Sequence, residues 1–401
     1  TSGVNDSPEE LESLSEVSYT HTSTSMNESG FSPLTVGHGH ICVITADDTL
    51  YCWGKGHGGT LGDGNASNSN TLVQPNLPSG NTAIQIEAGS HQTCAVLDDY
   101  SLYCWGSNNN GAVGDGSLGV QRNSPVEPDL PSGRTTVAIA TGDYHTCAIL
   151  DDDSLYCWGS SSNGQLGYGG TSSQDSPVAV NMPSGRYAKE IFAGTYHTCA
   201  ILDDDSLYCW GSNGYGQLGD GTTTDRSTPV SVSLPSGSSA SQISIGYDFT
   251  CAILDNSSLY CWGSNSYGRL GTGGGGASTP QWVNLGAGRT AVAITAAHRH
   301  ACAVLDDHSL YCWGDNSFGQ LGDGTTTDRS TPVAVSLPSG LTASTVEAGA
   351  FTTCAILDDD SLYCWGRNNY GQLTDGTTID RTTPVEISLP ASRTVTLDTD
   401  S

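Results

Sequence analysis

The sequence predicts an all-β fold, a seven-bladed β-propeller with four-stranded blades and one disulfide bond within each blade. Three observations predict it. The motif Tyr-Cys-Trp-Gly occurs seven times, with its tryptophans 51 to 53 residues apart. Fourteen cysteines form seven pairs whose members lie ten positions apart. The strand-like runs around each pair carry apolar side chains on both faces, which is typical of strands that are covered on both sides.

The hairpin of each unit places its two cysteines opposite each other. In the fourth unit, the runs 197–202 and 207–210 flank the acidic turn 203–205 and predict a β-hairpin. Cys199 and Cys209 then occupy directly opposed positions, where Cα atoms lie ~4.5–5.5 Å apart, within reach of a disulfide bond. The seven expected bonds join Cys42 to Cys52, Cys94 to Cys104, Cys147 to Cys157, Cys199 to Cys209, Cys251 to Cys261, Cys302 to Cys312 and Cys354 to Cys364.

Reduced core thiols and a metal site are the alternatives for these cysteines. Metal sites favour cysteines two to four positions apart, and no two cysteines of this chain are that close. The even count and the constant spacing favour disulfide bonds instead. Disulfide bonds at this density predict an oxidising compartment, so we expect a secreted protein, extracellular or at the cell surface.

Two further runs complete the four strands of a unit, 189–192 before the hairpin and 229–234 after it. Four-stranded sheets stacked around an axis cover both faces of each hairpin, whereas a linear solenoid needs atypical repeats at its ends. We expect the strand 394–397 to close the ring by completing the first blade. The competing segment 32–35 contains Pro33, whose missing N–H makes it a poor interior strand residue.

Charge narrows the range of partners. The chain holds 42 Asp and Glu against 13 Lys and Arg, a formal net charge of -29. Nucleic acid and anionic membranes attract basic surfaces, so neither is an expected partner. No apolar run approaches the ~20 residues of a membrane-spanning helix. The first residue is Thr1 rather than Met, which we interpret as a processed mature chain.

One fifteen-residue signature recurs through the chain. The fourth unit reads His-Thr-Cys-Ala-Ile-Leu-Asp-Asp-Asp-Ser-Leu-Tyr-Cys-Trp-Gly and continues as Ser-Asn-Gly-Tyr-Gly-Gln-Leu-Gly at 212–219. It resembles the repeat of the regulator of chromosome condensation family, from about Ser32 to Leu397. The resemblance implies a seven-bladed propeller, the blade number that the spacing also predicts. Some units depart from the pattern: Gly56 replaces the Asn in the first, and Thr374 replaces the closing Gly in the seventh.

The founding activity of that family is nucleotide exchange on a small nuclear GTPase, together with chromatin binding. The disulfide bonds, the acidic charge and the regular repeat spacing all oppose assigning this activity to the present chain. We expect instead an extracellular structural or adhesive protein-interaction module, part of a cell-surface or fibrous assembly. The alternatives are a secreted monomeric binder or inhibitor that uses one propeller face and, least favoured, a guanine-nucleotide exchange factor.

No catalytic site is predicted, because the Ser, His and Asp residues recur with the repeat, whereas a nucleophile needs a unique base beside it. Histidines stand just before the first cysteine of five units, where we expect hydrogen bonds at the strand start rather than a metal site: His40, His91, His145, His197 and His300. The acidic turns and the loop 220–226 predict turn capping and an Asp–Arg salt bridge. Calcium is the alternative for these carboxylates, and no other cofactor is expected.

The chain divides into an N-terminal arm, residues 1–30, and the propeller, residues 31–401. Ser7-Pro8-Glu9-Glu10 reads as a helix capping box. Leu11, Leu14 and Val17 follow at helical spacing, and we expect this arm to contact another subunit. The arm ends in a Ser/Thr-rich stretch open to O-glycosylation. Sequons for N-glycosylation stand at Asn5, Asn27, Asn65 and Asn256.

Overall fold

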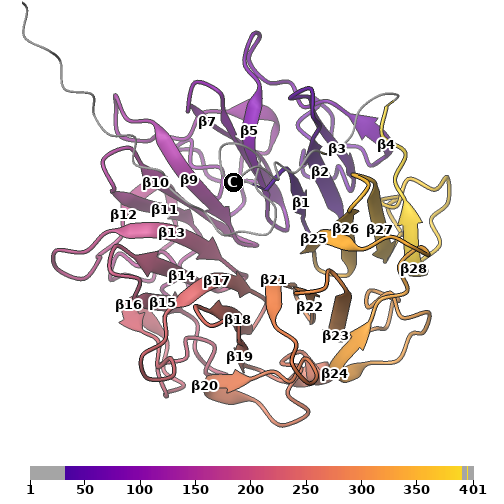
Figure 1. Ribbon diagram of the computed structural model, residues 1–401. Helices are drawn as coiled ribbons and strands as arrows, with labels where there is room; N and C mark the ends of the chain where they lie inside the picture. The colour runs from indigo at the N-terminus through magenta and orange to yellow at the C-terminus, as the bar shows by residue number, and fades with distance from the viewer. Residues whose placement is uncertain (1–31, 391–394, 396–401) are drawn as a thin grey trace, which may run out of the picture.

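The computed structural model describes residues 32–390 and Val395, which form seven four-stranded antiparallel sheets around a central axis (Figure 1). In every sheet the strands follow chain order from the axis outward. The first strands of the sheets contact one another in a closed ring that runs from β1 through β5, β9, β13, β17, β21 and β25 back to β1. The predicted seven-bladed propeller with four-stranded blades is confirmed.

The blades contain 28 strands within the described residues. Blades one to four comprise β1 (Leu34–Val36), β2 (His40–Ile44), β3 (Leu50–Gly54), β4 (Ser69–Val73); β5 (Ala83–Ala88), β6 (Gln92–Leu97), β7 (Leu102–Gly106), β8 (Arg122–Val126); β9 (Thr136–Thr141), β10 (His145–Leu150), β11 (Leu155–Gly159), β12 (Gln174–Ala179); β13 (Ala188–Ala193), β14 (His197–Leu202), β15 (Leu207–Gly211), β16 (Arg226–Ser231). Blades five to seven comprise β17 (Ala240–Ile245), β18 (Phe249–Leu254), β19 (Leu259–Gly263), β20 (Ala277–Trp282); β21 (Ala291–Ala296), β22 (His300–Leu305), β23 (Leu310–Gly314), β24 (Arg329–Ala334); β25 (Ala343–Ala348), β26 (Thr352–Leu357), β27 (Leu362–Gly366), β28 (Arg381–Glu386). A short 3-10 helix, η1 (Ser266–Gly268), lies between β19 and β20. The part of the chain that the structure describes holds no helix long and apolar enough to cross a membrane.

All fourteen cysteines form the seven expected disulfide bonds, one within each blade. The register is the one that the sequence predicts: Cys199 of β14 lies opposite Cys209 of β15, and Ile201 lies opposite Leu207. The bonded Cα atoms are 4.0 to 4.1 Å apart. The two central strands of every blade are therefore covalently joined at their midpoint.

Neighbouring blades pack through one repeated contact. The tryptophan of each Tyr-Cys-Trp-Gly motif is fully buried in an apolar cluster shared by two blades. Its indole N–H donates to a backbone carbonyl oxygen of the preceding blade, as Trp210 does to Gln165 at 2.9 Å. A buried indole needs such an acceptor, so the motif fixes how each blade sits against the next.

The ring closes differently from the sequence-based expectation. The inner strand of the first blade is β1, which pairs with β2 through Leu34↔Val43, so the prediction that 394–397 would supply it is wrong. Pro33 is tolerated because it stands just before the strand and contributes only its carbonyl, which accepts from the Ile44 N–H at 2.7 Å. Val395 nevertheless packs, fully buried, in the apolar cluster between the first and seventh blades.

The two ends of the propeller carry different connections. We call one end the loop face: it holds the loops from first to second strand, such as 194–196, and from third to fourth strand, such as 212–225. The other end, the turn face, holds the hairpin turns, such as 203–206. There the Asp204 carboxylate accepts from the Ser206 N–H at 3.2 Å. The predicted turn-capping role of these aspartates is confirmed.

Candidate functional site

Four of the histidines that precede a cysteine join neighbouring blades. Their Nε2 atoms lie 2.8 to 2.9 Å from threonine hydroxyls of the next blade, in the pairs His40 with Thr93, His145 with Thr198, His197 with Thr250 and His300 with Thr353. Burial lowers the pKa of each imidazole, to about 3 or about 4. The expected hydrogen bonds at the strand start are confirmed for these four residues.

The prediction that His91 makes the same kind of hydrogen bond is wrong. It stands one position earlier in its unit, and Gln92 occupies the equivalent place, where its Nε2 donates to the Gly142 carbonyl at 2.8 Å. His91 belongs instead to a different set of side chains on the loop face.

That set is a closed circle of seven half-buried rings, one from each blade, which we call the aromatic circle. Each ring centroid lies 5.3 to 6.3 Å from those of its two neighbours. The members, in order around the axis, are His38, His91, Tyr144, Tyr196, Tyr247, His298 and Phe351. They cover the mouth of the propeller axis at the loop face.

A hydrogen-bonded pair of side chains crosses this mouth. Asp143 of the third blade and His298 of the sixth blade approach to 2.8 Å, although they are 155 positions apart. Thr195 also donates to the same carboxylate at 2.8 Å. Burial alone would raise the pKa of Asp143, but His298 and the hydrogen bonds from Ser90 and Thr195 outweigh burial and lower it. The carboxylate is thus held ionised between opposite blades.

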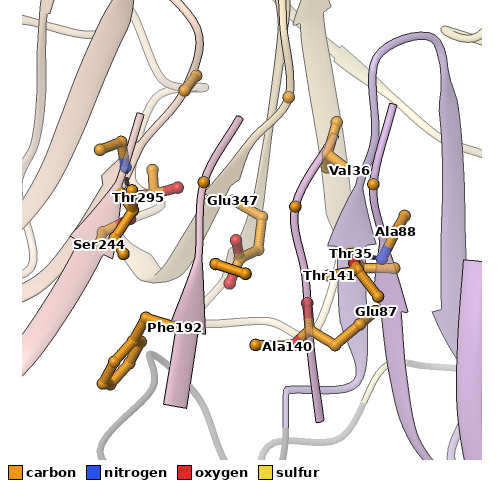
Figure 2. A pocket seen from close by; sticks show the side chains of 18 of the residues that line it. Thr35, Val36, Glu87, Ala88, Ala140, Thr141, Phe192, Ser244, Thr295 and Glu347 are labelled. Atoms are coloured by element: carbon orange, nitrogen blue, oxygen red, sulfur yellow. Dashed lines mark hydrogen bonds between the residues drawn. The ribbon is translucent and has the colours of Figure 1, made fainter. Parts of the chain in front are cut away.

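Behind the circle lies an axial cavity of about 220 Å³, lined by the inner strands (Figure 2). Glu87 and Glu347 line it from the second and seventh blades, and Glu190 from the fourth. Burial raises the pKa of Glu87 to about 8. Burial also raises the pKa of Glu190 to about 7, with Lys189 opposing and Asp205 adding to the effect. Near neutral pH a large fraction of each of these two carboxyl groups is therefore protonated and uncharged.

Positive charge gathers around the aromatic circle. Of the twelve Lys and Arg residues that the structure describes, eight lie within 4.0 Å of a carboxylate. The remaining four stand on the loop face, each over an aromatic ring: Lys55, Arg269, Arg299 and Arg367. We call these four cations and the aromatic circle together the aromatic–cationic face.

The cations contact exposed as well as buried rings. Arg299 is exposed and its guanidinium lies 5.2 Å from the ring centroid of Tyr267, which is itself 45% exposed. Arg367 lies 4.9 Å from the ring of Phe318. A cavity of about 440 Å³ opens beside Arg299 and Tyr267 and is also lined by Tyr215, which is 59% exposed. Aromatic and arginine side chains of this kind dominate the binding energy of protein interfaces.

The aromatic circle was not predicted from the sequence, because its members do not share one repeat position. Tyr144 and Tyr196 stand three positions before the first cysteine of their units, whereas Tyr247 and His298 stand four before it. An aromatic or histidine side chain within this two-residue window of every unit is the signal that could have found it.

The acidic loops between third and fourth strands are closed by arginine. The Asp220 carboxylate pairs with Arg226 at 2.8 Å, and Asp323 pairs with Arg329 at 2.7 Å. The predicted local Asp–Arg salt bridge is confirmed. In the described residues no group of three or more His, Cys, Asp or Glu side chains is placed to hold a metal ion.

Two of the four sequons lie in the described part of the chain, and both Asn65 and Asn256 are exposed. Asn5, Asn27 and the arm residues Leu11, Leu14 and Val17 lie outside the described residues. Their glycosylation and assembly roles stay predictions.

The fold and the aromatic–cationic face together define a class of protein: a disulfide-stapled repeat propeller that serves as a protein-interaction module. Residues 3–348 match the RCC1-like domain, and residues 343–372 and 359–397 match the regulator of chromosome condensation (RCC1) repeat. The chain belongs to the RCC1 family.

Two relatives and one solved structure are similar to this chain. The ultraviolet-B receptor UVR8 of Arabidopsis thaliana is 31% identical over 353 residues, which cover 88% of this chain and 80% of the receptor. The E3 ubiquitin-protein ligase HERC2 of Homo sapiens is 29% identical over 80% of this chain, which corresponds to only 7% of the ligase. The crystal structure of Prp20p from Saccharomyces cerevisiae superposes with a TM-score of 0.75 at 21% identity, covering 93% of this chain and 92% of Prp20p.

Proposed function

We propose that this protein is an extracellular protein-interaction module whose docking surface is the aromatic–cationic face. One observation carries the proposal. In a chain of net charge -29, the four cations without a carboxylate within 4.0 Å, among the described residues, all stand on one face and over aromatic rings. Arginine over tyrosine or phenylalanine offers a partner both apolar area and charge-assisted hydrogen bonds.

The setting of this function is a cell-surface or fibrous assembly. Seven disulfide bonds support an oxidising environment, because glutathione and thioredoxin keep cytosolic thiols reduced. The exposed sequon Asn256 lies in a hairpin turn of the turn face, where a glycan would stand away from the aromatic–cationic face, whereas Asn65 lies in a loop of the loop face.

A binding assay on intact source cells tests the proposal. Fluorescently labelled full-length, oxidised protein is applied to the cells, and bound label is measured against concentration. We expect Arg299→Gln with Arg367→Gln to weaken binding at least tenfold, since two arginines of an interface centre are lost. The matched control is Thr228→Glu with Gln281→Glu on the outer strands β16 and β20, which changes the net charge by the same amount. Equal binding by the two variants would place the docking surface elsewhere.

A secreted monomeric binder is the second candidate. The cavity beside Tyr215, Tyr267 and Arg299 favours it, because a pocket of about 440 Å³ could receive one side chain or short loop of a foreign partner. The mass of the native particle separates the two candidates: a monomer at all concentrations favours the binder, and a larger particle favours the assembly.

A further inference from the structure

We infer that the aromatic–cationic face of one copy binds the acidic N-terminal segment, residues 6–17, of a second copy of this chain. The inference rests on the proposed function, because it names the partner of the same face. It also commits the assembly to one geometry, in which copies stack with the loop face of one against the turn face of the next.

Charge complementarity is the first argument. Residues 1–31 contain six acidic residues and no Lys or Arg, and four of the acidic residues are Glu9, Glu10, Glu12 and Glu16. The described face offers exposed Arg299 and the half-buried Arg367 and Lys55, none of them within 4.0 Å of a carboxylate of the described chain. Carboxylates of the segment would provide the ion pairs that the eight other described Lys and Arg residues already have.

The apolar side chains of the segment also match exposed aromatic rings of the face. The same segment interleaves Leu11, Leu14 and Val17 with its glutamates. Beside Arg299 the face exposes Tyr215 and Tyr267, by 59% and 45%. Apolar side chains of the segment that cover these two rings would remove further apolar area from water, which favours binding. An acidic segment without apolar residues would gain only the salt-screened Coulomb attraction.

The position of Pro33 favours a second copy as the source of the segment. The Pro33 carbonyl accepts from the Ile44 N–H, and Ile44 directly precedes the hairpin turn of the first blade, so Pro33 lies at the turn face. The chain then runs through β1 to His38 at the loop face. The described part of the chain therefore begins at the end opposite to the aromatic–cationic face. A second copy placed head to tail presents its loop face directly to that end.

Such a contact uses two different surfaces and does not close on itself unless the rotation between copies forms a ring. Repeated along a stack, it produces a fibre. The strong negative charge of the copies opposes their approach, but the Debye length of about 8 Å at physiological ionic strength confines this repulsion to short range. The local ion pairs between the segment and the face then determine whether the copies assemble.

Sedimentation velocity of the full-length, oxidised protein over a hundredfold concentration range tests the inference. We expect a mass that rises with concentration. Glu9→Gln, Glu10→Gln, Glu12→Gln and Glu16→Gln together should raise the concentration of half-assembly at least tenfold, and so should Arg299→Gln with Arg367→Gln. Thr228→Glu with Gln281→Glu, the control that matches the arginine variant in charge, should leave it unchanged. Circular dichroism confirms that each variant retains its fold.

Reversing the charges on both sides tests whether these glutamates and arginines contact each other. Glu9→Lys, Glu10→Lys, Glu12→Lys and Glu16→Lys together should abolish assembly, and adding Arg299→Glu with Arg367→Glu to the same chain should restore it. A monomer at all concentrations overturns the inference, and if its residues 6–17 are also protected from protease, the segment binds its own propeller. Assembly that persists in both neutralised variants overturns it too. If the arm variant still assembles while the arginine variant fails to bind cells, the proposed function stands and only the named partner is wrong.

Discussion

The indole N–H of Trp53 in the first blade donates to the carbonyl oxygen of Gln372 in the seventh blade, 2.8 Å away and 319 positions along the chain. The same bond joins the other neighbouring blades, for example Trp105 to Thr60 at 2.9 Å. The interface that closes the ring is thus built like the others, although β1 has three residues where the other inner strands have six. Val395 adds a fully buried side chain to this one interface.

Val395→Ala should therefore lower the free energy of unfolding by about 1–3 kcal/mol, because a buried side chain loses two methyl groups and leaves a cavity. Urea denaturation followed by tryptophan fluorescence measures it. Val120→Ala, at a site that is 46% exposed, is the matched control and should change stability by less than about 0.5 kcal/mol. Equal effects of the two substitutions would show that Val395 does not contribute to ring closure.

Thr374 marks the one closing glycine position that the repeat fills with another residue. Its φ of 47° lies in the left-handed region that favours glycine, and its hydroxyl is buried without a hydrogen-bond partner among the described residues. Thr374→Gly should raise the free energy of unfolding by about 1 kcal/mol, since the relief of strain exceeds the added chain entropy. The reciprocal control, Gly322→Thr, should destabilise, because a Cβ there would meet the Trp365 indole at 2.7 Å. A less stable Thr374→Gly variant contradicts this interpretation.

The repeat period predicted the blades and the cysteine spacing predicted their register, because side chains alternate with period two and every unit repeats the same hairpin. Strand ends were less certain. The outer strand of the fourth blade is Arg226–Ser231 rather than 229–234, since the strand begins where Arg226 pairs with Asp220. Ring closure was missed because the absent N–H of Pro33 matters only inside a strand, and Pro33 stands before one.

The candidate site was much less predictable. The aromatic circle depends on a one-residue shift between units, as between Tyr196 and Tyr247. The hydrogen bond across its mouth joins Asp143 to His298, which no local pattern connects. Long-range pairs of this kind arise only when the ring closes, so they become visible in the fold and not in any single repeat.

Each disulfide bond should contribute a similar stabilisation. Replacing Cys199 and Cys209 by serine removes a cross-link around an eleven-residue loop, and the chain-entropy model gives a loss of about 2–3 kcal/mol. The equivalent double substitution at Cys302 and Cys312 should cost a similar amount, because both pairs lie at the same register position. Guanidinium denaturation of the two oxidised variants measures this. A large difference between them would show that local packing, rather than loop closure, dominates.

The buried histidines should make the protein sensitive to acid. Burial holds the pKa of His145 at about 4, against an ordinary value of 6.5. Between these values the unfolded chain binds a proton that the folded chain does not, so stability falls as the pH falls, by up to about 1.4 kcal/mol per pH unit for each such histidine. His145→Gln copies the natural Gln92 of the second blade and should reduce this slope. Urea titrations at pH 4.5 to 7 compare the variants, and parallel slopes would contradict the assignment.

The buried carboxyl group of Glu87 in the axial cavity should have the opposite effect on stability, which it should lower as the pH rises. Burial raises the pKa of Glu87 to about 8, so the folded protein keeps this carboxyl protonated while the unfolded chain, with a pKa near 4.5, has released its proton. The stabilisation from the neutral carboxyl is complete below pH 4.5 and is lost as the pH rises toward 8, by up to about 1.4 kcal/mol per pH unit. Glu87→Gln preserves the shape without the titration and should flatten the decline in melting temperature between pH 5 and 8. Glu127→Gln, at an exposed carboxyl outside the cavity, is the control and should leave the decline as it is. A Glu87→Gln profile that parallels the wild type would mean that Glu87 ionises in the folded protein as it does in water.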